Sequence, residues 1–448
     1  MVIRTPPGAN QPLFDGHLLG WKQTAENCSR KLGFCSEAAD QKGSQDVPPP
    51  EPVIYADDSH LMTFAPTGSG KGRGVIIPTL LSYPGSVVVV DPKGENYAVT
   101  ARRRREMGQK VVVLDPFGRA TRGSEQADSF NVFDLFKLPR TILDADAHML
   151  AWQLAAGNAF SRDPFWDNVG TGFLFGLIAH VASGVPENER NMNKVMSYLY
   201  NDDVVYNLAV LLDSKTVVNP HAHREIAAFL QLPERDTRPS VLATALSYVK
   251  ALNTECVEQC MASSTFDLKD LLHGNPISIY LCIPPEKLTS HKSLLRLWMG
   301  TLLNTVLRRE HRPKDRTLFL LDECAQLGSM PLLESAVTLM RGYGLQVWSF
   351  WQDMEQVRSC YPQGGETLIN NAAVLQAFGI SNNRMARQLM DLLDCPATDL
   401  LAMKPGQCRS FVRGQGSFTC RLPDYLNDPV FRGLWDENPF FDPGGRSQ

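Results

Sequence analysis

Short apolar runs alternate with helix-like segments in the first part of the chain. Residues 60–66 (HLMTFAP), 85–92 (GSVVVVDP) and 109–116 (QKVVVLDP) are apolar and bounded by Gly or Pro. Runs of this length predict buried strands, and the segments between them have helical spacing. Strands that alternate with helices predict β-α-β units, and therefore a parallel sheet.

The middle of the chain has a different pattern. Between about Ser124 and Gly274 strand-like runs nearly vanish, and pieces such as 142–157 (ILDADAHMLAWQLAAG) and 168–183 (NVGTGFLFGLIAHVAS) have helical spacing. Strand-like runs then resume at 276–284, 316–323, 344–352, 370–378 and 406–414. We therefore predict an α/β fold in which a mainly parallel sheet is built from both flanks of an inserted all-α domain.

The two ends of the chain lack this periodicity. Residues 1–52 close on a proline-rich stretch, SQDVPPPEP, so we expect a poorly ordered segment and a linker there. Residues 436–448 are expected to form a tail. The sheet domain is then divided into a first and a second part around the insertion, with boundaries at 53–123, 124–274 and 275–435.

The composition excludes several classes of protein but does not identify the function. A net charge of -4 argues against a protein that coats nucleic acid with its whole surface, but it leaves a local basic channel open. The 10 cysteines contain no CxxC pair, which favours reduced thiols in a reducing compartment. We find neither a signal peptide nor an apolar run long enough to span a membrane.

The stretch APTGSGKG after the first strand has the pattern of a phosphate-binding loop. Backbone N–H groups in such a loop point at phosphates, and a lysine reaches the β and γ oxygens. Lys71 suits the second role, and Gly72 stands where a Ser or Thr is usual. The alternative is a glycine-rich turn with a surface lysine. The predicted nucleotide-binding residues are Thr67, Gly68, Ser69, Gly70, Lys71 and Gly72.

Acidic residues follow a later apolar strand in RTLFLLDECAQLG. Asp322 is the candidate Mg²⁺ residue, and Glu323 is the candidate residue for orienting the attacking water. Gln352, at the end of the next strand, is a candidate sensor of the γ-phosphate. The alternatives are a solvated acidic turn for the two acids and a capping or surface amide for the glutamine.

Five motifs together, APTGSGKG, VVDPKGE, LDPF, FLLDECAQLG and WSFWQD, resemble the coupling proteins of type IV secretion systems, the TraG and TraD type of conjugative ATPase. The resemblance covers roughly Tyr55 to Asp424. It implies a RecA-like P-loop motor that uses ATP and Mg²⁺, and Gly72 is usual in the TraG branch. Without a hydroxyl there, Mg²⁺ coordination must depend on Asp322, ATP oxygens, water, or the hydroxyl of Thr67 or Ser69.

The resemblance also implies an assembly and partners. Members form a homo-oligomeric ring, a hexamer, at the cytoplasmic face of the inner membrane, and pass relaxase–DNA complexes or effector proteins to the secretion channel. DNA binding would then be independent of sequence, because the contacts go to phosphates. Most members carry N-terminal membrane helices, and we expect none here. A nucleotide-binding recruitment scaffold with little hydrolysis is the alternative function.

Arginines complete the candidate site. Ring motors often complete each site with an arginine from the next subunit, and Arg341 stands where the resembling family often has one. The alternative is an ordinary arginine at a helix C-terminus, where the helix dipole favours it. Arg384 is the second candidate. The run Arg102–Arg105 fits a solvated helix face better than a phosphate-binding surface.

Overall fold

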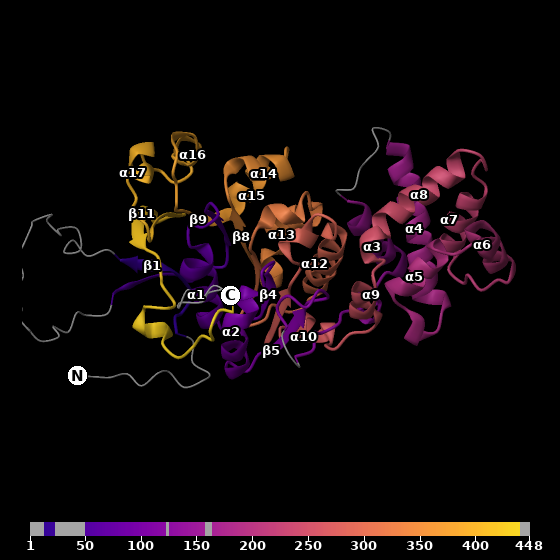
Figure 1. Ribbon diagram of the computed structural model, residues 1–448, viewed down its shortest axis with the longest axis horizontal. Coiled ribbons are helices and arrows are strands. Elements are labelled where there is room, and N and C mark those ends of the chain that lie inside the picture. Colours follow the sequence, from indigo (N-terminus) through magenta and orange to yellow (C-terminus); the bar gives the residue numbers. More distant parts are fainter. Residues whose placement is uncertain (1–12, 23–49, 122–124, 157–163, 440–448) are drawn as a thin grey trace, which may run out of the picture.

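The computed structural model describes residues 13–22, 50–121, 125–156 and 164–439, and an eleven-stranded sheet forms its centre (Figure 1). The strand order is β2-β1-β11-β10-β9-β3-β8-β7-β4-β6-β5. Neighbours from β9 to β5 run parallel, which confirms the predicted α/β class. These strands are β3 (His60–Phe64), β4 (Val87–Val90), β5 (Lys110–Leu114), β6 (Ile277–Leu281), β7 (Thr317–Leu321), β8 (Leu345–Trp351) and β9 (Ala372–Ala377).

The remaining strands pair antiparallel and extend the sheet beyond β9. Of these, β10 (Gln407–Val412) is predicted, whereas β1 (His17–Lys22), β2 (Pro52–Tyr55) and β11 (Gly416–Arg421) are not. The expectation of low order for residues 1–52 is therefore wrong for β1. Its order comes from pairing with β11, a partner distant in sequence, which local periodicity does not report. Residues 1–12 and 23–49 lie outside the described residues.

Helices cover both faces of the parallel strands. Val88 and Val90 of β4 belong to one buried cluster, and Val87 and Val89 belong to the other, because successive side chains of a strand point to opposite faces. The helices of the sheet domain are α1 (Ile77–Ser82), α2 (Glu95–Glu106), α11 (Pro285–Leu288), α12 (Lys292–Leu307), α13 (Pro331–Leu339), α14 (Met354–Cys360), α15 (Gly365–Asn371), α16 (Asn383–Leu389) and α17 (Ala397–Leu401).

A helical lobe separates β5 from β6 in the sequence and lies to one side of the sheet (Figure 1). No strand occurs in the described part of this segment. The inserted all-α domain is thus confirmed as an element of the fold, and its boundaries at 124 and 274 stay a prediction. Its helices are α3 (Leu143–Ala155), α4 (Pro164–Gly184), α5 (Met192–Leu199), α6 (Val204–Asp213), α7 (Pro220–Leu230), α8 (Thr237–Val249), α9 (Glu255–Ala262) and α10 (Leu268–His273).

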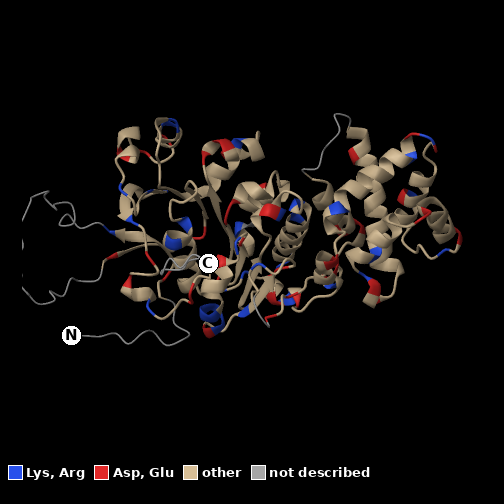
Figure 2. Cartoon of the chain, viewed as in Figure 1, with Lys and Arg blue, Asp and Glu red and all other residues tan. Residues whose placement is uncertain are grey.

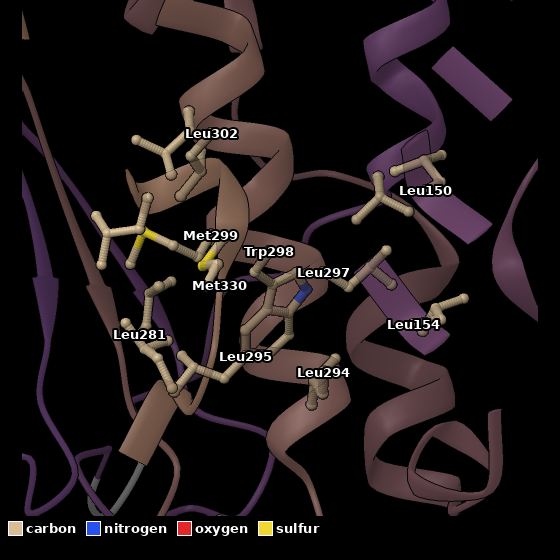
Figure 3. Packing of buried hydrophobic residues seen from close by; sticks show 14 of the residues in the cluster. Leu150, Leu154, Leu281, Leu294, Leu295, Leu297, Trp298, Met299, Leu302 and Met330 are labelled. Atoms are coloured by element: carbon tan, nitrogen blue, oxygen red, sulfur yellow. The ribbon is translucent and has the colours of Figure 1, made fainter. Parts of the chain in front are cut away.

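Helix α12 joins the helical lobe to the sheet. Its apolar side chains reach the end of β6 at Leu281 on one side and α3 at Leu150 and Leu154 on the other (Figure 3). Gly300 allows α3 to approach, because a Cβ there would lie 2.7 Å from Cδ of Gln153. Burial on nearly all sides makes α12 a shared core element of both parts.

The arginine run on α2 corrects one expectation. Arg103 and Arg104 are buried, and Arg104 donates to the carbonyl oxygen of Gly85 at 2.6 Å and to the hydroxyl of Ser278 at 2.8 Å. A buried guanidinium is stable only when its donors are satisfied, so these contacts make Arg104 part of the fold. The solvated-face expectation is wrong for these two arginines.

Charge is distributed over the whole described chain. Lys and Arg alternate with Asp and Glu on both the sheet and the helical lobe (Figure 2). Within the described residues, no helix has both the length and the apolar character that crossing a bilayer requires.

Candidate nucleotide site

The predicted phosphate loop lies at the carboxyl edge of the sheet, which we define as the side where β3, β7 and β8 end. The loop connects β3 to a turn of π-helix at Gly72–Ile76 that continues into α1. Gly68 and Gly70 have φ of 79° and 91°, in the left-handed region that favours glycine. A Cβ added at Gly68, Gly70 or Gly72 would meet nothing within 4 Å. The loop is therefore open on the side where phosphates approach such loops.

Four predicted residues converge beside this loop. Nζ of Lys71 lies 3.0 Å from Oδ1 of Asp322 and forms an ion pair with Glu323. Nε2 of Gln352 donates to Oε2 of Glu323 at 3.0 Å. These residues come from the ends of three neighbouring strands, so the register of the parallel sheet brings them together.

The backbone at Glu323 is unusual. Its φ of 58° and ψ of 53° are left-handed, although it is not a glycine. Such a conformation costs on the order of 1 kcal/mol and is found where the surroundings hold it in place, often at functional sites. This turn directs the carboxylate of Glu323 to Lys71 and Gln352, and the short helix at Cys324–Leu327 follows it.

Burial and charge oppose each other in this cluster. Burial disfavours the charged amine of Lys71, but the carboxylates of Asp322 and Glu323 outweigh burial and raise the pKa of Lys71 above its ordinary value. Burial also raises the pKa of Asp322, against the opposing effect of Lys71. A cluster with one amine and two carboxylates carries an excess of negative charge, which a cation or a proton would relieve.

Asp91 and Lys93 of the DPKGE motif lie at the same edge, at the end of β4. Asp91 is buried and accepts a hydrogen bond from the backbone N–H of Tyr97 at 2.8 Å. Burial, with a contribution from nearby Asp322, raises the pKa of Asp91 to about 7. Lys93 is exposed, and its charge lowers the pKa of Asp322. The motif thus belongs to the electrostatic surroundings of Asp322.

The two hydroxyls of the loop differ. Thr67 is exposed, whereas Ser69 donates from Oγ to the carbonyl oxygen of Pro66 at 2.6 Å. Gly379, in the connection after β9, packs against the loop, because a Cβ there would lie 2.5 Å from Cβ of Ser69. Gly379 is not among the predicted site residues, although a glycine that follows a buried strand is a signal in the sequence.

A second unpredicted contact holds the helix after the loop. Nε and Nη2 of Arg73 donate to the two carboxylate oxygens of Asp424 at 2.7 and 2.6 Å. Leu422 packs beside Gly74, with its Cβ 3.2 Å from the position of an added Cβ. The chain after β11 therefore reaches the nucleotide edge, and no local motif at Asp424 signals this contact.

Arg341 lies away from the other predicted residues, on the amino edge, where β3 and β8 begin. It is in the turn Met340–Tyr343 before β8, and its Nε donates to Oδ1 of Asp58 at 2.6 Å. Nη2 lies 3.7 Å from Asp57. Arg384 lies after β9 and is 3.9 Å from Glu355. Neither arginine contacts Lys71 within its own chain in the described contacts.

The donor set fits Mg²⁺ bound together with phosphates. The described residues contain no group of three or more His, Cys, Asp or Glu side chains that could hold a metal alone. Magnesium is usually held by one or two carboxylates together with phosphate oxygens and water, so the partly buried Asp322 beside an open phosphate loop suits it.

Comparison with known proteins places this geometry in a family. The family model for type IV secretory system conjugative DNA transfer matches residues 23–393. The chain belongs to this family.

The chain is also similar to curated proteins. It is 27% identical over 354 residues to a conjugal transfer protein TraG of Escherichia coli, and the match covers 74% of this chain and 54% of TraG. It is 26% identical to the type IV secretion system-coupling protein VirD4 of Bartonella quintana, covering 68% of this chain and 48% of VirD4. The chain thus spans about half the length of these curated relatives.

Solved structures show the family fold. The bacterial conjugative coupling protein TrwBdeltaN70 superposes with a TM-score of 0.65 at 16% identity, covering 83% of this chain and 87% of that protein. TrwB in complex with ADP and Mg²⁺ superposes with a TM-score of 0.64, covering 91% of this chain and 95% of that one. The likeness confirms the RecA-like P-loop architecture with its helical insertion.

Proposed function

We propose that this member of the conjugative DNA transfer family is an ATP-hydrolysing coupling protein. The observation that carries the proposal is the convergence of Lys71, Asp322, Glu323 and Gln352 beside an open loop formed by Thr67 to Gly72. Transfer of a phosphoryl group to water requires a cation at the phosphates, an acid for the metal, an acid for the attacking water and a polar group near the γ-phosphate, all at one site.

The roles follow from the contacts. Lys71 now contacts two carboxylates, and in the ATP complex it neutralises the β and γ phosphates in their place. The backbone N–H groups of the loop bind the same phosphates. Glu323, released from Lys71, orients the attacking water, and Gln352 reports on the γ-phosphate. Asp322 would hold Mg²⁺ together with phosphate oxygens and water, and the metal would supply positive charge to the phosphate oxygens.

The proposal includes a ring. A head-to-tail ring places one side of each subunit against the opposite side of the next. Arg341 lies on the amino edge, opposite its own phosphate loop, which supports a role at the nucleotide of a neighbour in a hexamer. In this arrangement Arg341 leaves Asp58 and meets the charge that develops on the γ-phosphate.

The cargo and location are proposed from the family. The ring acts at the cytoplasmic face of the inner membrane, where it receives relaxase–DNA complexes or effector proteins and passes them to the type IV secretion channel. DNA contacts go to phosphates, so binding should show little sequence preference and weaken steeply with salt.

Phosphate release tests the proposal. The purified chain is incubated with ATP, Mg²⁺ and single-stranded DNA, and Lys71→Ala provides the background. We expect release that rises with DNA and with protein concentration, because the site is completed by assembly. The exposed Lys250 serves as the matched control, and Lys250→Ala should retain full release. ATP binding without turnover in an assembled ring would instead identify a recruitment scaffold.

A further inference from the structure

Two buried cysteines face each other across the hairpin of β10 and β11. Cys408 and Cys420 are direct partners in the antiparallel register, and their sulfur atoms are 3.0 Å apart. Directly opposed residues in antiparallel strands have Cα atoms about 4.5–5.5 Å apart, which lies within the range that a disulfide bridges. The strands therefore hold the two thiols in a geometry that needs little backbone movement to become a bond.

We propose that Cys408 and Cys420 are a modification site at which hydrogen peroxide forms a reversible cross-strand disulfide. The Cys420 thiolate attacks one peroxide oxygen, the O–O bond breaks, and protonation of the leaving hydroxide gives water and a sulfenic acid on Cys420. The sulfur of Cys408 then attacks the Cys420 sulfur, and its proton leaves with the sulfenic oxygen as a second water. Two thiols and one peroxide thus give one disulfide and two waters, with peroxide as the oxidant.

The surroundings of the sulfurs support this chemistry. The Cys408 thiol hydrogen-bonds to Cys420 and lowers the pKa of Cys420, which favours the attacking thiolate. Gly20 of β1 makes room beside the pair, because a Cβ there would lie 2.4 Å from the Cys420 sulfur.

Access to the pair depends on β1, which covers it. The thiols are fully buried, and the ladder between β1 and β11 consists of the pairs Trp21–Arg421 and Lys22–Cys420. Residues 17–21 of β1 are buried, so exposing the pair requires a partial opening that costs free energy. We therefore expect the oxidation to be slow and limited by local opening, in contrast to the reaction of the more exposed Cys256.

Peptide mapping of the full chain tests the proposal. The protein is treated with hydrogen peroxide, its remaining thiols are alkylated, and it is digested with trypsin without reductant. Cleavage at Arg387, Arg409 and Arg413 places Cys408 in peptide 388–409, together with Cys395, and Cys420 in peptide 414–421. The disulfide appears as these two peptides linked, two hydrogens lighter than their sum with Cys395 alkylated, and fragmentation assigns the bond to Cys408. We expect this pair, and we expect dithiothreitol to abolish it. Alkylation of both Cys408 and Cys420 after peroxide would overturn the proposal.

A stability measurement with matched variants gives a second readout. A disulfide that closes this hairpin constrains the unfolded chain, so oxidation should raise the thermal midpoint. We expect the rise in the wild type and in Cys256→Ser, and its absence in Cys408→Ser and Cys420→Ser. An equal rise in the wild type and in Cys408→Ser would assign the effect to another thiol and overturn the proposal. The readout does not use ATP, so it is independent of the proposed function.

Discussion

The two edges of the parallel sheet carry opposite kinds of ion pair. At the carboxyl edge, the side chain of Lys71 is 15% exposed and lies between two carboxylates, beside an open loop. At the amino edge, the side chain of Arg341 is 52% exposed and pairs with Asp58. Asp58 itself is 14% exposed, so the pair differs from the Lys71 cluster in its exposed arginine, which can exchange partners at little cost, whereas every member of the cluster is mostly buried. This difference supports the proposal that the carboxyl edge holds the residues for hydrolysis and that the amino edge faces a neighbouring subunit.

The largest expected effect tests the amino edge. Arg341→Ala should lower ATP hydrolysis by about a thousandfold, the typical value of an arginine finger, and leave ATP binding by a single chain intact. Chains with Arg341→Ala are then mixed with chains carrying Glu323→Gln, because each retains what the other lacks. Partial recovery of phosphate release in mixed rings is the expected result.

Two controls make this mixing decisive. Arg384→Ala chains are mixed in the same way, and Asp58→Asn removes the resting partner of Arg341 without removing the arginine. If mixing restores nothing while both variants assemble, Arg341 does not act across the interface. Recovery with Arg384→Ala alone would move the role to that residue.

The next effect tests the carboxyl edge. Glu323→Gln keeps the size of the side chain but removes the charge that orients water, so hydrolysis should fall by about 100-fold or more. ATP affinity, measured by isothermal titration calorimetry, should hold or improve, because Lys71 loses a competing carboxylate. Glu366→Gln, at an exposed position, is the control. A large loss of ATP affinity in Glu323→Gln would contradict the assigned role.

The two halves of the sheet differ in how far the sequence predicts them. The parallel strands are buried on both faces and appear as continuous apolar runs between Gly and Pro, so all of them are predicted. The antiparallel strand β1 is ordered by β11 and by the chain after β11, over long sequence distances. Periodicity within a window cannot report such pairing.

The site shows the same division. Asp322, Glu323 and Gln352 are predictable because they follow recognisable strands, and Lys71 because it ends a glycine-rich loop after one. Parallel strands end at one edge, which brings these residues together. Contacts made through tertiary structure are not predictable, as with Asp424, which reaches Arg73. The buried Arg104 was missed because an arginine run has the same pattern whether water or backbone carbonyls satisfy it.

Removing the amine of Lys71 at the carboxyl edge should weaken ATP binding. Lys71→Ala loses a charge-assisted contact to the phosphates and leaves Asp322 and Glu323 without their cation, so ATP affinity should fall by about 10- to 100-fold. Calorimetry with ATP and Mg²⁺ measures this loss, and Lys250→Ala should bind normally. Equal losses of affinity in Lys71→Ala and Glu323→Gln would undo the separation of roles.

A smaller effect is expected at Gln352, which touches the cluster through one hydrogen bond. Gln352→Ala removes the bond to Glu323, so the carboxylate becomes less restrained, and hydrolysis should fall about 10-fold at most. Gln352→Glu places a third carboxylate beside Glu323 and should be worse than alanine, because like charges repel. Phosphate release from the two variants ranks them, and an unchanged rate in both would assign Gln352 a capping role.

The smallest effect concerns the stability of the amino edge. His17 and His60 are buried there, and burial lowers the pKa of each to about 4. In the unfolded chain each histidine takes up a proton near pH 6.5, while the folded chain keeps it neutral, so stability falls as the pH drops below 6.5. We expect each histidine to lower the free energy of unfolding by about 1 kcal/mol between pH 7.5 and 5.5, measured by urea unfolding.

A variant at His60 tests this expectation. Nδ1 of His60 accepts a hydrogen bond from the backbone N–H of Val347. In His60→Asn the amide oxygen can accept the same bond, and the side chain does not titrate. That variant should therefore remove the contribution of about 1 kcal/mol from His60, and the exposed His311→Asn should remove none. An unchanged slope in His60→Asn would show that the pH dependence arises away from this edge.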